Sequence, residues 1–222
     1  MKKSITPLLM FFAVLFVTCL LISNVAAAKM FQLGPWALTS GVLIFPISYI
    51  MSDVIAEVYG FKRARNIMWL GFGMNLLMVI YFQIAIALPA PVWYQNGDAF
   101  NTVLSSTPRV FIASLLAYAA GSYINAAAIS KIKVMTKGKH FGVRAVISTV
   151  LGESVDSIIF ISIAFAGTMP FTALWQMVVL QLIVKTVYEI IALPITTIVV
   201  RKVKKVEGID TFDKGIKYGI VG

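Results

Sequence analysis

Residues 151–160 read LGESVDSIIF and lie inside an apolar run, 143–167, that is long enough to cross a bilayer. Two acids, Glu153 and Asp156, stand three residues apart within it and therefore share one face of a helix. A carboxylate at membrane depth is costly and normally faces a bundle interior or a water-filled cavity. The stretch predicts a membrane-spanning helix with an inward acid pair, which the rest of the chain is expected to surround.

The composition places the chain outside the range of soluble proteins. Of its 222 residues, 59% are hydrophobic and only 13% are charged. The formal net charge of +10 would suit nucleic-acid binding in a soluble protein. In a membrane protein cationic loops set the orientation, so we expect the lipid bilayer as partner and no nucleic acid. With one cysteine and one histidine in the sequence, neither a metal site nor a cofactor is expected.

Six apolar runs predict an all-α integral membrane protein with one membrane domain, residues 1–222. The expected spans are 5–28, 36–59, 66–88, 110–130, 143–167 and 171–200, followed by a cytoplasmic tail, 201–222, that is at most partly ordered. The first run also resembles a cleavable signal peptide, but its length favours a retained span. Pro46, inside the second run, predicts a kink or a break there.

The cations are distributed very unequally between the two sides of such a bundle. With the N-terminus in the cytoplasm, sixteen of the nineteen Lys and Arg residues are cytoplasmic. Lys29 and Arg109 lie outside, and Lys185 lies within a span. This positive-inside bias requires an even number of spans and places both termini in the cytoplasm. Three spans on either side of the long loop, 90–108, also allow two inverted three-helix halves.

Polar side chains within the spans are the candidates for ligand binding. The expected substrate-binding residues are Glu153, Asp156, Asp53, Asn125, Glu57, Gln181, Lys185, Glu189, Tyr123 and Phe160. Structural alternatives exist for several of them. Glu57 has Lys62 or Arg63 as nearby partners, and Lys185 and Glu189 are one helical turn apart and can neutralise each other. The amides can simply join helices.

Three motifs resemble those of a known family. They are residues 53–60 (DVIAEVYG), 152–157 (GESVDS) and 185–189 (KTVYE). In this order, over roughly residues 35–200, they resemble the queuosine-precursor transporter family within the vitamin-uptake group of bacterial membrane proteins. The resemblance implies a multi-pass importer in the bacterial cytoplasmic (inner) membrane. Its substrates would be 7-cyano-7-deazaguanine, 7-aminomethyl-7-deazaguanine or queuine, taken up for tRNA modification salvage.

The residue types suit such a substrate. One carboxylate can accept adjacent N–H donors of the base, and a second would favour the aminomethyl cation. Aromatic side chains can sandwich the ring. The group is also similar to the S components of energy-coupling-factor transporters. Two modes of uptake therefore stay open: the chain works alone, with or without protons, or it requires a separate ATPase module. Small residues in the spans favour a homodimer. An intramembrane enzyme using the acid pair as general acid and base is the remaining alternative.

Overall fold

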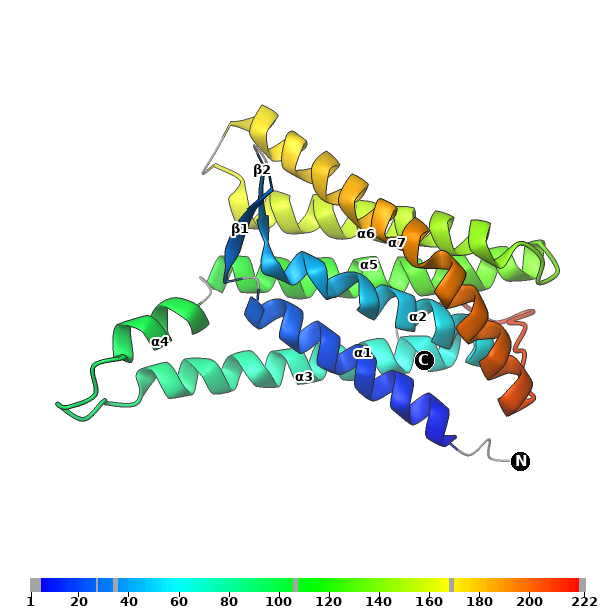
Figure 1. Cartoon of the computed structure of the whole chain (residues 1–222), viewed down its shortest axis with the longest axis horizontal. Coiled ribbons are helices and arrows are strands. Elements are labelled where there is room, and N and C mark those ends of the chain that lie inside the picture. Colours follow the sequence, from blue (N-terminus) through cyan, green and yellow to red (C-terminus); the bar gives the residue numbers. More distant parts are fainter. Residues whose placement is uncertain (1–4, 27, 34–35, 106–107, 168–169, 220–222) are drawn as a thin grey trace.

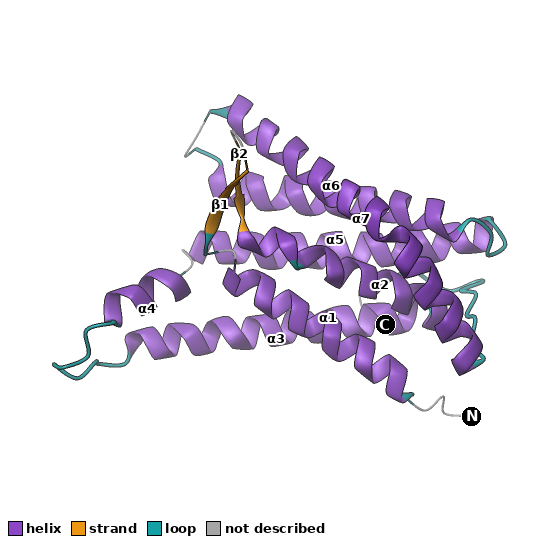
Figure 2. Cartoon of the chain, viewed as in Figure 1, coloured by secondary structure: helices purple, strands orange, loops and turns teal. Residues whose placement is uncertain are grey.

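The computed structural model describes residues 5–26, 28–33, 36–105, 108–167 and 170–219. Its helices are α1 (Pro7–Ala26), α2 (Phe45–Tyr59), α3 (Phe61–Ala87), α4 (Gly97–Leu104), α5 (Pro108–Met135), α6 (Phe141–Phe165) and α7 (Phe171–Glu207). Helix dominates the described part of the chain (Figure 2). Six helical segments there are long and apolar enough to cross a membrane. The all-α membrane bundle expected from hydropathy is therefore confirmed.

The second span differs most from its prediction. Its expected first residues form a strand instead, because β1 (Met30–Leu33) and β2 (Trp36–Thr39) pair as an antiparallel hairpin. A 3₁₀ turn, η1 (Ser40–Leu43), precedes α2. Pro46 lies in the first turn of α2, where its missing N–H costs no helical hydrogen bond, so the break comes before Pro46. With 15 residues, α2 alone reaches only about 22 Å, and η1 completes the crossing.

Three other helices outrun their predicted bounds. The third span begins at Phe61 instead of residue 66, and α5 continues past residue 130 to Met135. The last helix, α7, has 37 residues and ends at Glu207. At that length it measures about 55 Å, against about 30 Å for the apolar layer of a bilayer. The helix is therefore longer than the apolar layer is thick, and its C-terminal turns carry the cations of residues 201–205.

The connections of the helices gather at two ends of the bundle (Figure 1). The start of α1, the α2–α3 turn, the α5–α6 loop and the end of α7 lie together, and strands β1 and β2, the end of α6 and the start of α7 lie at the opposite end. We call the first the basic end, comprising residues 60–65, 131–144 and 201–219. This clustering agrees with the expected topology. The orientation in the membrane, the inverted halves and the single domain stay predictions.

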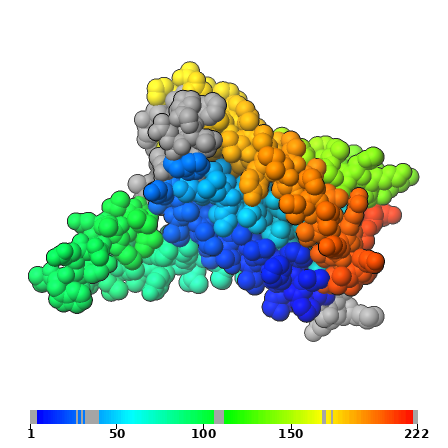
Figure 3. All heavy atoms as spheres, viewed as in Figure 1, coloured from blue at the N-terminus to red at the C-terminus, as the bar shows by residue number. Residues whose placement is uncertain are grey.

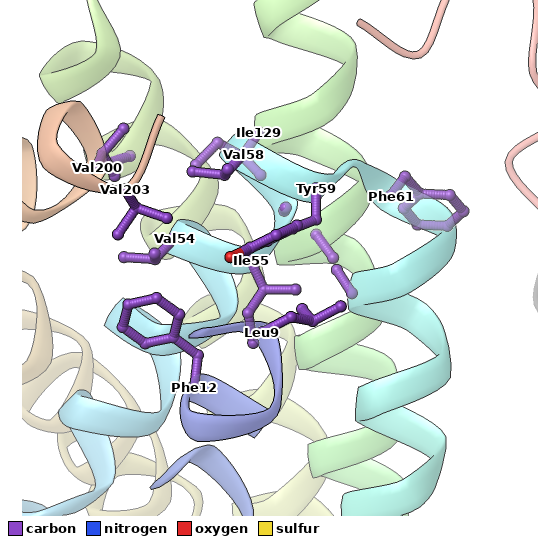
Figure 4. Packing of buried hydrophobic residues seen from close by; sticks show 14 residues of the cluster. Leu9, Phe12, Val54, Ile55, Val58, Tyr59, Phe61, Ile129, Val200 and Val203 are labelled. Atoms are coloured by element: carbon purple, nitrogen blue, oxygen red, sulfur yellow. The ribbon is translucent and has the colours of Figure 1, made fainter. Parts of the chain in front are cut away.

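A hydrophobic core lies next to the basic end, where α1, α2, α3, α5 and α7 meet (Figure 4). The buried members labelled there are Leu9, Phe12, Val54, Ile55, Val58, Tyr59, Phe61, Ile129, Val200 and Val203. At the other end of the molecule, α4 and the adjoining end of α3 project away from the body (Figure 3). The core therefore fixes the C-terminal ends of α2 and α7.

Helices α5 and α6 approach closely because two glycines face each other. A Cβ atom on Gly152 would lie 2.8 Å from the Cβ of Asn125, and one on Gly121 would lie 2.8 Å from the Cβ of Asp156. Small residues allow such close contact between membrane helices. The contact places Asn125 and Asp156 at the same helix–helix interface.

The residues that follow α7 fold back over the basic end. Thr211 donates its N–H to the carbonyl of Val58 (3.1 Å). The Asp213 carboxylate accepts from the Phe61 N–H (2.7 Å) and from the Ser130 hydroxyl (2.5 Å). We call residues 208–219 the C-terminal tail. The expectation that the tail is at most partly ordered is wrong for these residues, because α2, α3 and α5 all bind it.

Two glycines at the basic end make room for the C-terminal tail. Gly60, between α2 and α3, has φ +89°, and Gly138, in the α5–α6 loop, has φ +79°. L-residues rarely adopt these angles. A Cβ atom would also lie 2.7 Å from Thr211 Cγ2 at the first position and 2.8 Å from Phe212 Cζ at the second. Each glycine therefore serves both the turn and the docking of the tail.

Candidate functional site

Polar residues from four helices meet inside the bundle. The central polar cluster consists of Asp53 on α2, Asn125 on α5, Glu153 and Asp156 on α6, and Lys185 and Glu189 on α7. None of these residues is more than 7% exposed. Six of the ten residues predicted to bind substrate are thus brought together. Burying this much charge in a small bundle is costly, and such residues in membrane proteins usually serve function.

One half of the cluster is an interhelical ion pair. The Lys185 ammonium donates to Glu153 Oε2 and to Asp156 Oδ2, the latter at 3.1 Å. The same ammonium lies 4.6 Å from the centroid of the Phe45 ring. The alternative in which Lys185 pairs with Glu189 is wrong. Its ammonium group binds the two carboxylates of α6 instead. Glu153 and Asp156 do share a face of their helix.

The other half of the cluster consists mainly of hydrogen-bond acceptors. Asn125 donates from Nδ2 to Asp53 Oδ1 at 2.6 Å. Asp53 Oδ2, Asn125 Oδ1 and both carboxylate oxygens of Glu189 have no hydrogen-bond partner within the part of the chain that the structure describes. Glu189 lies within electrostatic range of both Asp53 and Glu153. A buried polar atom left unsatisfied costs about 1–3 kcal/mol, so this half suits a ligand that supplies donors.

Glu57 belongs to a different network at the basic end. Its carboxylate, 1% exposed, binds the Arg144 guanidinium through both oxygens, with Nη2 to Oε1 at 3.1 Å. Lys204 on α7 donates to the same carboxylate at 2.6 Å. The expected pairing with Lys62 or Arg63 is wrong, because the partners come from other helices. Its oxygens are already satisfied, so Glu57 holds α2, α6 and α7 together.

Two of the cations counted as cytoplasmic are buried within helices. Lys133 on α5 and Arg144 on α6 are each 1% exposed. Lys133 donates to the Glu57 carbonyl and to Asp210 Oδ1, both at 2.5 Å, and to the Thr211 carbonyl at 2.8 Å. A lysine beside a basic loop gives no sequence signal of burial. Lys133 therefore joins the end of α2 to the C-terminal tail.

The remaining predicted residues lie elsewhere. Tyr123 donates its hydroxyl to the Tyr218 carbonyl of the C-terminal tail at 3.0 Å. Phe160 makes an edge contact with Phe165, with ring centroids 6.0 Å apart. Gln181 is half-buried on α7, one turn before Lys185. The structure does not place the two aromatic residues in the central polar cluster.

Sequence reasoning missed an aromatic residue that borders the central polar cluster. Phe45 lies beside the Lys185 ammonium and contacts Tyr49, with ring centroids 5.4 Å apart. A Cβ atom on Gly121 would lie 2.8 Å from the Tyr49 hydroxyl, so this ring reaches the α5–α6 interface. A phenylalanine in an apolar run carries no signal of such a role. The two rings form an aromatic wall at the start of α2.

Comparison with known proteins finds a matching family and a similar bacterial protein. Residues 39–199 match the family described as "Putative vitamin uptake transporter". The chain is 25% identical over 173 residues to a Bacillus subtilis (strain 168) protein named "Probable queuosine precursor transporter", covering 78% of this chain and 76% of that protein. No solved structure matches the chain. The family match includes every residue of the central polar cluster.

Proposed function

This chain belongs to the family of vitamin uptake transporters, and from that membership we propose that it imports queuosine precursors, which are 7-deazaguanine bases. It is a multi-pass protein of the bacterial cytoplasmic membrane, and six helices within the described ranges are able to cross the bilayer. The name of its Bacillus subtilis relative supports this substrate class. The proposed path runs through the central polar cluster.

The observation that carries this proposal is the set of acceptor atoms without donors. These are Asp53 Oδ2, Asn125 Oδ1 and the two Glu189 oxygens. A 7-deazaguanine presents a ring N–H and an exocyclic amine side by side, and one carboxylate can accept both. Glu189 is the best placed for this role, because both of its oxygens are unengaged. Glu153 and Asp156, in contrast, already bind Lys185.

An aromatic wall adds a second type of contact. Phe45 and Tyr49 lie at the start of α2, and Phe45 is next to Lys185. Stacking on an aromatic ring contributes about 1–3 kcal/mol per base and tolerates different substituents. In the proposed complex the acceptors fix the orientation of the base, and the rings supply nonspecific affinity.

Uptake in cells that cannot make the precursor tests the proposal, with queuosine in tRNA as the readout. The parent chain should restore queuosine when the base is supplied, and Glu189→Gln should reduce uptake at least tenfold, because an amide N–H then faces the donors of the base. Glu207→Gln, the same change at the far end of α7, should behave like the parent. Normal uptake by Glu189→Gln at equal expression would contradict the proposed site.

A second candidate function is a substrate-binding S component that needs a separate ATPase module. The family description as a vitamin uptake transporter favours it. Purified chain in liposomes distinguishes the two. Downhill uptake of 7-cyano-7-deazaguanine by the chain alone supports an autonomous transporter, whereas binding without uptake supports the S component. Proton coupling and a homodimer stay predictions.

A further inference from the structure

The ammonium group of Lys185 sits among three groups that together bind alkylammonium ions. Glu153 and Asp156 accept its hydrogen bonds, the latter at 3.1 Å, and the Phe45 ring centroid is 4.6 Å away. Lys185 itself is only 6% exposed. Carboxylates combined with an aromatic face are a recurrent arrangement for recognising such cations.

We propose that Glu153, Asp156 and Phe45 form a primary-ammonium site, and that Lys185 is its tethered occupant. We call these three residues the ammonium cage. Through this occupant, the transporter sets its preference between neutral and cationic bases. The statement about bases rests on the proposed function, whereas the existence of the cage does not.

The division of the central polar cluster supports this assignment. The ammonium cage holds a cation, whereas the other half of the cluster holds none among the described segments. Glu189 binds no cation there. Asp53 accepts a hydrogen bond from the Asn125 amide. Lys185 thus serves the two carboxylates of α6, although Glu189 is one turn away on its own helix. A neutral base can bind the free acceptors and leave Lys185 in place.

A base with an aminomethyl group meets a different situation. Its ammonium must either displace Lys185 from the cage or lie near a like charge in a site of low dielectric constant, which weakens binding. Replacement of Lys185 by a neutral residue removes this competitor and leaves two carboxylates without a cation. The affinity for the cationic base should then rise relative to that for the neutral base.

Chemical rescue tests the cage without any transport substrate. Lys185→Ala removes the charge and opens space, whereas Lys185→Met removes the charge and fills the space. Methylammonium chloride should raise the thermal unfolding temperature of purified Lys185→Ala in a saturable manner, beyond the effect of sodium chloride at equal ionic strength. It should have no such effect on Lys185→Met or on the parent.

Two results would overturn the cage. One is the absence of any methylammonium-specific stabilisation of Lys185→Ala, and the other is equal stabilisation of Lys185→Met. If Lys185→Ala is not monodisperse when purified in sodium chloride, purification in methylammonium chloride replaces the thermal assay. Recovery of monodisperse protein supports the cage, and failure to recover it counts against the cage.

Calorimetry tests the consequence for substrates. The ratio of the affinity for 7-aminomethyl-7-deazaguanine to that for 7-cyano-7-deazaguanine should increase at least tenfold in Lys185→Met relative to the parent. Lys205→Met, at an exposed lysine of the same helix, should leave the ratio unchanged. An unchanged ratio in Lys185→Met overturns the role in selectivity. If the parent binds neither base, the proposed function fails, while the methylammonium result still decides the cage.

Discussion

Glu153 and Lys185 bind each other across the α6–α7 interface, and both are almost completely buried. Removing one member of a buried ion pair typically costs about 3–5 kcal/mol, because the other charge is left uncompensated. In Glu153→Gln, Lys185 keeps only Asp156 as its ionic partner among the described residues. We therefore expect this variant to unfold at a markedly lower temperature than the parent in the same detergent.

A double variant separates this effect from general disruption of the helix. Glu153→Gln/Lys185→Met removes both members of the pair and leaves one carboxylate, Asp156, without a cation. It should lose less stability than the sum of the two single changes, because Lys185→Met alone leaves two carboxylates without a cation. A double-mutant cycle from thermal or denaturant unfolding gives the coupling energy. A double variant as unstable as the sum of its single changes would show that the pair contributes nothing through its interaction.

At the residue scale, sequence alone could identify the buried acids but not their partners. Glu153 and Asp53 stand out because a charge within an apolar run needs an explanation. The partner of Glu57 was sought nearby in the sequence, whereas Arg144 reaches it from another helix. Nothing in the sequence marks Phe45 as a neighbour of the polar cluster. Partner choice depends on how the helices pack, and a single sequence does not contain this information explicitly.

The α5–α6 contact is the element whose packing most directly shapes the central polar cluster. A Cβ atom on Gly152 would lie 2.8 Å from the Asn125 Cβ and 2.8 Å from the Gly121 carbonyl oxygen. A Cβ atom on Gly73 of α3 would meet nothing within 4 Å. Gly152→Leu should destabilise the fold by more than about 1–3 kcal/mol, because the backbone of α5 must move. Gly73→Leu is the matched control and should unfold at nearly the parental temperature. Equal losses in both variants would contradict close packing at this interface.

The C-terminal tail provides a pH-dependent prediction. Burial alone would raise the pKa of Asp210, but the hydrogen bonds from Lys133 and Lys204 outweigh it and hold that pKa below its ordinary value of 3.8. The ionised carboxylate therefore stabilises docking at neutral pH, and this contribution disappears as the pH falls through the lowered pKa. Asp210 is 45% exposed, so we expect less than about 1 kcal/mol, decreasing with added salt.

Hydrogen exchange measures this effect locally. Asp210→Asn should accelerate exchange of the Thr211 amide, which donates to Val58 in the docked tail. The acceleration should be largest at neutral pH and low salt. Asp98→Asn, at an exposed acid on α4, should leave Thr211 unchanged. Equal protection of this amide in Asp210→Asn and in the parent would show that the ion pairs do not hold the tail.

At the element scale, hydropathy predicts that the six long helices exist but not where each begins and ends. The strand at Trp36–Thr39 was missed because its residues continue the apolar run of α2. The short helix α4 falls in the segment expected to be a loop. The order of the C-terminal tail depends on contacts such as that of Asp213 with Ser130, which are distant in sequence.

For the molecule as a whole, the distribution of cations predicts the orientation. Reporter domains fused after Gly60, Lys139 or Val203 should report the cytoplasm, and one fused near Gly97 should report the outside. The first three positions belong to or lie near the basic end, and α4, which begins at Gly97, projects beyond the opposite side of the core (Figure 1). A cytoplasmic signal at Gly97 would overturn the six-span topology. The fusion at Val203 also replaces the tail, so its expression level needs a separate check.

The docking of the C-terminal tail has a consequence for biosynthesis. The ribosome completes α2, α3 and α5 long before it translates Asp210, Thr211 and Asp213, which later bind them. During that interval Lys133 lacks the Asp210 carboxylate and the Thr211 carbonyl, and of the three acceptors described above it has only the Glu57 carbonyl. Membrane insertion of the helices and sealing of the basic end are therefore separate events. The second can occur only after residues 208–219 have left the exit tunnel.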